Sequence, residues 1–236
     1  MRNTLSLIFV SLIFSFLGSC ASQQAPLKMQ HGLWGKALSN AQAPRPGGPL
    51  RFASLPFASK PDAKRTQQVA AVAQQFVKNA NSKKSNSYRK DCSGLARAIY
   101  KDAGRPLGGS STYRGENDVS VLYRYSQRHG QLHRNKPHPG DLVFFDNTID
   151  LNRDGDINDL LTHVGVVERI NADDTIIFVH QMGPRPVRAR MNLRQPQLIQ
   201  DPKTGKRVNH ILRRGKKGEP HKTTASLFAG FASISL

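Results

Sequence analysis

Residues 163–180 read HVGVVERINADDTIIFVH. Two short apolar runs rich in Val, Ile and Phe flank a polar stretch at residues 171–174, and this pattern predicts two buried strands joined as a hairpin. The strand ends far from a hairpin turn lie side by side, so His163 and His180 are expected at the same end of a sheet. The segment therefore predicts an antiparallel pair that carries two histidines at one end.

The rest of the chain extends this pattern in both directions. Apolar residues at helical spacing predict helices over about 63–79, 92–104 and 118–128. A turn at Pro139-Gly140 precedes a further buried strand over 142–145. A weaker strand is expected within 208–213, and a final apolar segment runs from 227 to 234. Helices followed by an antiparallel sheet predict an α+β fold.

Cys92 stands at the predicted start of a helix, with Asp91 as the candidate N-cap. The helix dipole and the unpaired amides of the first turn stabilise a thiolate there. The same amides can donate to an oxyanion on a substrate carbonyl, and Gly94 is expected to keep the approach to the thiol free of bulk. A buried, unreactive cysteine is the alternative.

A cysteine nucleophile needs a nearby proton acceptor, and His163 is the candidate. His180 is expected to bond Nδ1 of His163 and to orient the ring, so that the other ring nitrogen faces Cys92. A structural role at a strand end is the alternative for both histidines. The other histidines are expected to be exposed in polar loops: His31, His129, His133, His138, His210 and His221.

Four blocks in one order resemble the signature of NlpC-type cell-wall cysteine peptidases, which are papain-like hydrolases. The blocks are residues 91–95 (DCSGL), 139–145 (PGDLVFF), 163–167 (HVGVV) and 178–180 (FVH). The resemblance covers about residues 63–182 and implies a papain-like domain with N-terminal helices on a small antiparallel sheet. It also implies a Cys-His-His triad and cleavage of peptidoglycan stem peptides, commonly between D-glutamate and diaminopimelate.

The resemblance leaves the substrate contacts less defined than the triad. Family members usually carry a Tyr and a Gly-Gly about a dozen residues before the cysteine, and residues 79–87 contain neither. Tyr88 and Ser93 are the candidates for substrate or oxyanion contacts. Two other functions stay open: a CHAP-type amidase or acyltransferase that uses the same Cys and His, and a non-catalytic, calcium-stabilised wall-binding lipoprotein.

Residues 1–19 have the layout of a secretory signal peptide: a basic start, an apolar run over 5–17, and small residues before Cys20. Leu17-Gly18-Ser19-Cys20 resembles the bacterial lipobox, which implies a lipid on Cys20. Residues 20–60 are rich in Ala, Gln, Pro, Gly and Ser and are predicted to be a tether. The hydrolase domain with a C-terminal extension is then expected over 61–236. An exported protein, lipid-anchored at the periplasmic face or cell surface, is the prediction; a plain signal peptide is the alternative.

The chain is strongly basic, with 35 Lys and Arg against 16 Asp and Glu and a formal net charge of +19. Such a charge concentrates anionic partners. We expect peptidoglycan or another anionic cell-wall polymer as the partner, and the membrane through the N-terminal lipid. No nucleic-acid motif accompanies the charge, so nucleic acid is not expected. Catalysis by a thiol and an imidazole requires no cofactor.

The segment from Asp150 to Asp159 alternates oxygen-bearing side chains like the front of an EF-hand calcium loop. Gly155 provides the sharp turn, while Leu161 stands where the loop's last acidic ligand belongs. A structural Ca²⁺ ahead of His163 is therefore predicted, with an Asx-rich polar loop as the alternative. The candidate ligands are Asp150, Asn152, Asp154, Asp156, Asn158 and Asp159.

Overall fold

The computed structural model describes residues 63–80 and 87–235. The predictions for the signal peptide, for the lipid on Cys20 and for the tether lie outside these residues, as does His31. Within the described residues, no helix is both long enough and apolar enough to cross a bilayer.

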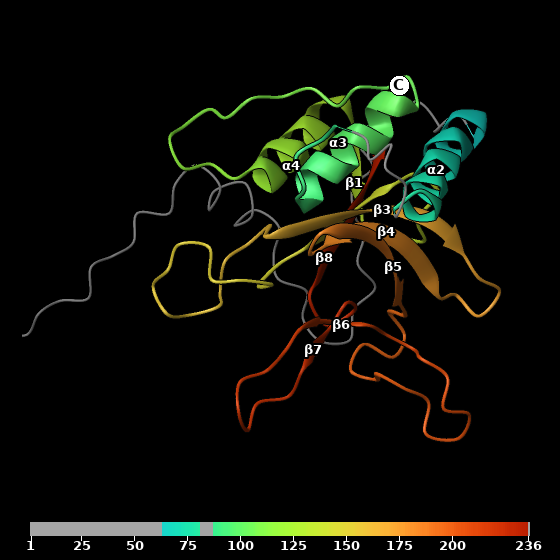
Figure 1. Cartoon of the computed structure of the whole chain (residues 1–236), viewed down its shortest axis with the longest axis vertical. Helices are drawn as coiled ribbons and strands as arrows, with labels where there is room; N and C mark the ends of the chain where they lie inside the picture. Colours follow the sequence, from blue (N-terminus) through green and yellow to red (C-terminus); the bar gives the residue numbers. More distant parts are fainter. Residues whose placement is uncertain (1–62, 81–86, 236) are drawn as a thin grey trace, which may run out of the picture. The chain divides into compact units, whose positions relative to one another are not determined.

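Helices precede strands along the chain, and the predicted α+β class is confirmed (Figure 1). The helices of the described residues are α2 (Ala63–Lys78), α3 (Cys92–Asp102) and α4 (Asp118–His129). Six strands form one antiparallel sheet in the order β1-β8-β2-β3-β4-β5. Their bounds are β1 (Gly130–His133), β2 (Leu142–Phe145), β3 (His163–Ile170), β4 (Ile176–Met182), β5 (Arg185–Met191) and β8 (Phe228–Ile234). A second, two-stranded sheet pairs β6 (Ile211–Arg213) with β7 (Lys222–Thr223).

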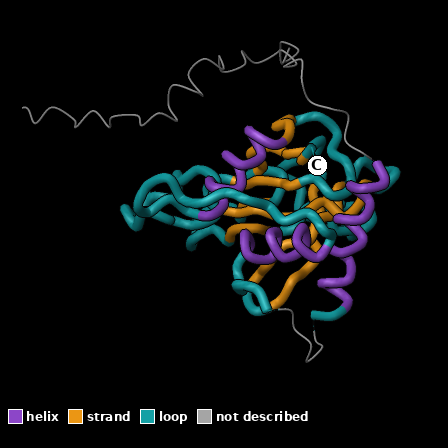
Figure 2. Tube along the Cα trace, turned by 90° about the horizontal axis from the view of Figure 1, so that it is seen from above, coloured by secondary structure: helices purple, strands orange, loops and turns teal. Residues whose placement is uncertain are grey.

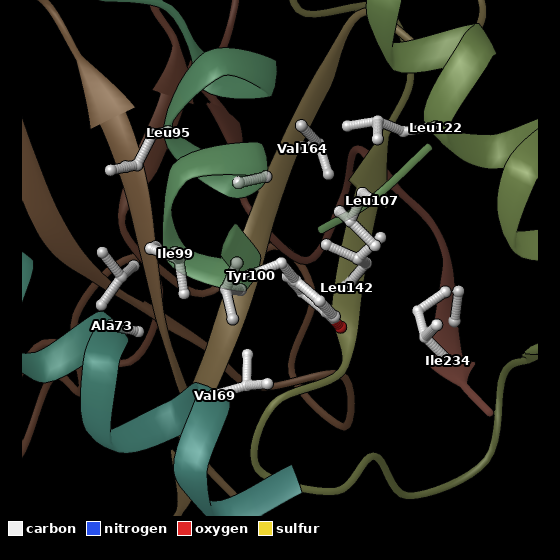
Figure 3. Close-up of a cluster of buried hydrophobic side chains, with 14 of the residues drawn as sticks. Val69, Ala73, Leu95, Ile99, Tyr100, Leu107, Leu122, Leu142, Val164 and Ile234 are labelled. Atoms are coloured by element: carbon white, nitrogen blue, oxygen red, sulfur yellow. The ribbon is translucent and has the colours of Figure 1, made fainter. Parts of the chain in front are cut away.

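The helices lie over one face of the large sheet (Figures 1 and 2). Side chains of α2 and α3 meet those of β2 and β3 in a fully buried cluster, seen in Figure 3 around Val69, Ile99, Leu142 and Val164. Each such aliphatic side chain contributes roughly 1.5–3 kcal/mol when it leaves water. Tyr100 also belongs to this cluster, and its hydroxyl donates to the Gly140 carbonyl at 2.6 Å, which satisfies its buried polar atom.

A second cluster covers the opposite face of the sheet. Phe145 and Phe178 pack there with residues from beyond position 182, namely Met191, Leu227 and Phe231. The C-terminal segment is therefore part of the fold and not an appendage. It supplies the edge strand β5 and also β8, which pairs with both β1 and β2 inside the sheet.

Three strands escaped prediction, and β5 shows why. Its sequence mixes Arg185, Pro186 and Arg188 with buried Ala189 and Met191, so it lacks a continuous apolar run. Proline cannot donate to a strand ladder and is tolerated only at the edge of a sheet, which is where β5 lies. The short strands β1 and β7 carry Gly, Gln, His and Lys and give no sequence signal either.

Candidate active site

Cys92 is the first residue of α3, and its helix start is built as predicted. The Asp91 side chain accepts a hydrogen bond from the Gly94 backbone N–H at 2.7 Å, which caps the helix. The cap fixes the backbone on both sides of Cys92. The partly buried thiol is thereby held at the positive end of the helix dipole.

The thiol of Cys92 contacts the beginning of β3. The backbone N–H of Val164 lies close enough to the thiol to lower its pKa. Val164 directly follows His163, and α3 packs on β3 and β4. The nucleophile candidate and the base candidate therefore lie on adjacent segments, although 71 positions separate them in the sequence.

Burial decides the protonation state of the thiol. It raises the pKa of Cys92, and the negative charge of Asp91 acts in the same direction. The backbone N–H groups of Val164 in β3 and of Ser93 and Cys92 at the helix start lower the pKa, but they do not outweigh burial. The resting nucleophile is a neutral thiol, and the stabilised resting thiolate expected from the sequence is corrected.

His163 and His180 meet at one end of the β3–β4 hairpin, as predicted. Nε2 of His163 lies 2.8 Å from Nδ1 of His180, and the two rings are nearly perpendicular. The sequence-based assignment of nitrogens was wrong, because Nε2 and not Nδ1 of His163 makes this bond. Nδ1 of His163 has no hydrogen-bond partner among the described residues and remains available for a proton.

Both histidines are neutral at pH 7. Burial lowers the pKa of His163 from 6.5 to about 4. Burial also lowers the pKa of His180 well below its usual value, and the nearby His163 and His210 add to the effect. The rings contact Phe145 and Phe178, so an apolar surface surrounds the pair. The thiol of Cys92 and both imidazoles are therefore neutral at pH 7.

The side chain of Ser93 is engaged in the helix cap, so an oxyanion contact of this residue would come from its backbone N–H. Its side chain is buried, donates to Asp91 Oδ1 at 2.8 Å and accepts from Arg89 Nη2 at 2.7 Å. The hydroxyl thus belongs to the helix cap and does not face a substrate. The backbone N–H of Ser93 lowers the pKa of the Cys92 thiol.

Tyr88 lies beside the site and is tied to β4. Its hydroxyl donates to Gln181 Oε1 at 2.9 Å, and its ring packs edge-on against Phe76. Gln181 is buried and directly follows His180. The bond joins the segment that presents the thiol to the strand that carries the second histidine. Gln181 was missed because no local pattern marks a glutamine in an apolar strand as a partner.

Arg89 is a second residue that the sequence did not indicate. Its guanidinium forms ion pairs with Asp91, the cap of α3, and with Asp118 in the first turn of α4. Its carbonyl oxygen explains Gly94: a Cβ at that position would lie 2.1 Å from it. Gly94 therefore allows the chain to pack closely before the helix, which corrects its expected role of clearing the approach to the thiol.

The predicted calcium loop is a hydrogen-bonded turn in this structure. Asp150 Oδ2 accepts from the Gly155 N–H at 2.9 Å, and Asp159 Oδ2 accepts from the Leu151 N–H at 2.7 Å. Asn152 and Asp154 bond to each other and to following backbone amides, while Asp156 and Asn158 are exposed. Among the described residues, no three His, Cys, Asp or Glu side chains are grouped to hold a metal ion.

Two other histidines differ from the exposed positions expected for them. His133 belongs to β1 and is 8% exposed, with Nε2 at 3.1 Å from Ser233 Oγ and 3.4 Å from Asp141 Oδ2. His210 is partly buried, and its Nδ1 accepts from the Arg190 N–H. A separate cavity of about 260 Å³ lies between residues 109–112 and α4, and none of the catalytic candidates lines it.

Comparison with known proteins finds a domain family that matches the part of the chain containing the catalytic candidates. The model of the CHAP domain matches residues 81–182, which is less than half of the chain and includes Cys92, His163 and His180. CHAP domains are typically cell-wall hydrolases, either amidases or peptidases. No curated protein and no solved structure matches the chain. A CHAP domain is thus found at residues 81–182, consistent with the NlpC- and CHAP-type cell-wall cysteine peptidases.

Proposed function

We propose that this protein is an exported cysteine hydrolase that cleaves peptide bonds in the stem peptides of peptidoglycan. Cys92 is the nucleophile, His163 the base, and His180 the residue that orients His163. The hydrogen bond between the two histidines is the observation that carries the proposal. The backbone N–H of Val164, the residue after His163, also acts on the Cys92 thiol. The CHAP match over the same residues supports the cell wall as the substrate.

The neutral state of the site defines the first chemical step. The thiol sulfur attacks the substrate carbonyl carbon while its proton passes to Nδ1 of His163. The carbonyl oxygen gains a negative charge, which the free backbone N–H groups at the start of α3 stabilise. His163 then gives its proton to the leaving amine, and a thioester on Cys92 remains.

Water completes the reaction by the reverse sequence. His163 takes a proton from the water that attacks the thioester carbonyl. The C–S bond breaks, the thiol recovers its proton, and a carboxylate product leaves. His180 supports both steps because its neutral Nδ1 accepts the Nε2–H of His163, which holds the ring and stabilises the transient imidazolium.

Digestion of purified peptidoglycan tests the proposal. The full chain in neutral detergent is compared with Cys92→Ala, with His163→Ala and with the control His138→Ala, whose side chain is exposed. Products are identified by mass. We expect new peptide fragments with the unchanged chain and the control, and none with the other two variants. Absence of products from the unchanged chain, with the Cys92 thiol shown to be unreactive, favours the wall-binding alternative.

The same digestion distinguishes a peptidase from an amidase, which the CHAP match equally supports. A peptidase shortens the stem peptides, whereas an amidase of the glycan–peptide bond releases them whole. Transfer to an added amine would identify an acyltransferase. Fragments cut between D-glutamate and diaminopimelate would match the specificity that the NlpC resemblance implies.

We also propose that a lipid on Cys20 attaches the protein to a bacterial membrane. The support is the sequence of residues 1–20 alone. Metabolic labelling with a radioactive fatty acid tests it, with Cys20→Ser as the comparison. Label that persists in Cys20→Ser contradicts the assignment.

A further inference from the structure

The segment beyond the CHAP match concentrates the positive charge of the chain. Residues 183–236 contain twelve Lys and Arg residues but only two acidic residues, Asp201 and Glu219. Two loops, 200–207 and 214–221, carry much of this charge, and we call them the cationic loops. Five exposed cations of these loops form no ion pair among the described residues: Lys203, Arg207, Arg214, Lys216 and Lys217.

The cationic loops project from one fixed base. Asn209 is fully buried, and its side chain donates to the carbonyls of Gln195 and Leu198, each at 2.8 Å. Thr223, also buried, donates to the Pro196 carbonyl and so joins β7 to the preceding segment. Figure 1 draws both loops on the side of the large sheet away from the helices. The cations are thus presented on a preorganised support.

The two acidic residues of the segment do not neutralise these cations. Asp201 Oδ1 accepts from the backbone N–H groups of Lys203 and Thr204 at 2.9 and 2.8 Å. Glu219 Oε2 faces the backbone N–H of Lys216 at 3.4 Å. Both carboxylates stabilise their own turns, and none of the ion pairs among the described residues includes any of the five exposed cations.

Uncompensated like charges that are held close together repel one another and gain from an external anion. We propose that the cationic loops bind a water-soluble polyanion of the cell wall, a polymer that bears phosphate or carboxylate groups. The proposal rests on the proposed function for its placement at the wall. It adds a second contact with the wall, made by residues other than the three catalytic candidates.

The composition of the loops favours a soluble polymer over two other polyanions. Surfaces that dock on membranes combine cations with apolar side chains that insert into the lipid. The large apolar side chains that are exposed in the described residues all lie outside 192–223: Tyr113, Ile149, Leu151, Leu160 and Met182. Residues 192–223 also contain no Phe, Tyr or Trp on which the bases of a single-stranded nucleic acid could stack.

Binding measurements on the full chain in neutral detergent test the proposal. The probes are inorganic polyphosphate, poly-L-glutamate, and phosphatidylcholine vesicles that contain phosphatidylglycerol. The variant Arg214→Gln/Lys216→Gln/Lys217→Gln removes three charges from one loop. The control Lys101→Gln/Arg114→Gln/Arg128→Gln removes three exposed charges elsewhere. The double variant Lys203→Gln/Arg207→Gln tests the other loop independently, so a folding defect in one variant does not end the test.

We expect the loop variants to bind at least one polymer about tenfold more weakly at low salt, while the control changes affinity less than twofold. The dependence of affinity on salt should also become shallower in the loop variants, because fewer counterions are released. The preferred probe tells phosphate from carboxylate. Equal losses in loop variants and control, or binding to vesicles without binding to either polymer, overturns the proposal.

Cleavage of a small soluble muropeptide separates this proposal from the proposed function. The variant Arg214→Gln/Lys216→Gln/Lys217→Gln should cleave it at the rate of the unchanged chain, because none of its three residues is a catalytic candidate. If the unchanged chain cleaves nothing but the loop variants still lose polymer binding, the proposed function fails and the binding surface stands. If the unchanged chain cleaves the muropeptide but the loop variants bind the polymers as well as it does, only the proposed binding surface is refuted.

Discussion

The low pKa of His163 predicts that the folded state loses stability as the pH falls from 6.5 to about 4. In that interval the imidazole of the unfolded chain takes up a proton, while the same group in the folded protein stays neutral. The unfolded state therefore binds more protons, and the free energy of unfolding falls with decreasing pH. Below about pH 4 both states are protonated, and no further loss arises from this group.

The size of the effect follows from the pKa difference between the two states. A pKa of 6.5 in the unfolded chain and of about 4 in the folded protein gives a loss of about 3 kcal/mol between pH 7 and pH 4. This is a large share of the stability of an ordinary domain, which is on the order of 5–15 kcal/mol. His180, whose pKa is lowered in the same direction, adds to the loss.

The variant His163→Gln isolates the contribution of this one residue. Glutamine does not titrate, and its amide can still donate to His180. Urea unfolding of both proteins, followed by circular dichroism at several pH values between 4 and 7, gives two curves of stability against pH. We expect their difference to change by about 3 kcal/mol across the interval. Parallel curves would show that His163 titrates normally and would refute the neutral, buried pair.

Three further predictions concern catalysis, packing and the metal. The value of kcat/KM should rise with pH around pH 4, where His163 loses its proton and becomes able to act as the base. It should fall only above the ordinary pKa of a cysteine, because the pKa of Cys92 is raised. A loss of activity on acidification that is centred on pH 6.5 would contradict this prediction. Gly94→Ala brings a Cβ to 2.1 Å from a backbone carbonyl and should lower the free energy of unfolding by about 1–3 kcal/mol, against less than about 1 kcal/mol for Gly230→Ala, whose Cβ meets nothing nearer than 3.6 Å. Calcium should raise the melting temperature, and Asp154→Asn/Asp156→Asn should abolish the rise; an unchanged melting temperature would leave the loop as a turn held by hydrogen bonds alone.

The features that the sequence predicted well are those set by neighbouring residues. The cap of α3 depends on Asp91 and on an amide three positions later, so a short stretch contains all its determinants. The β3–β4 hairpin depends on two apolar runs and the turn between them, and it brings His163 and His180 together. The strand at 142–145 was found with its bounds unchanged, because all four residues are apolar and fully buried.

The features that escaped prediction depend on contacts between distant segments. The final apolar stretch was expected, but its insertion as β8 between β1 and β2 requires pairings that no local pattern encodes. The bond between Tyr88 and Gln181 spans 93 positions. The protonation state of Cys92 could not be read from its helix start alone, because burial in the assembled fold outweighs the helix amides.

The neutral pair of His163 and His180 depends on residues outside the matched domain. His163 and His180 contact Phe145 and Phe178, and that aromatic surface is covered by Leu227 and other residues after position 182. The same C-terminal segment therefore closes the second face of the sheet, keeps water from the histidines and carries the cationic loops. In the proposed mechanism a buried neutral pair generates charge only when the thiol attacks a substrate, which limits unwanted reactions of Cys92. Activity and stability should therefore be lost together at low pH, because protonation of His163 removes both the proposed proton acceptor and the stability that the neutral ring contributes.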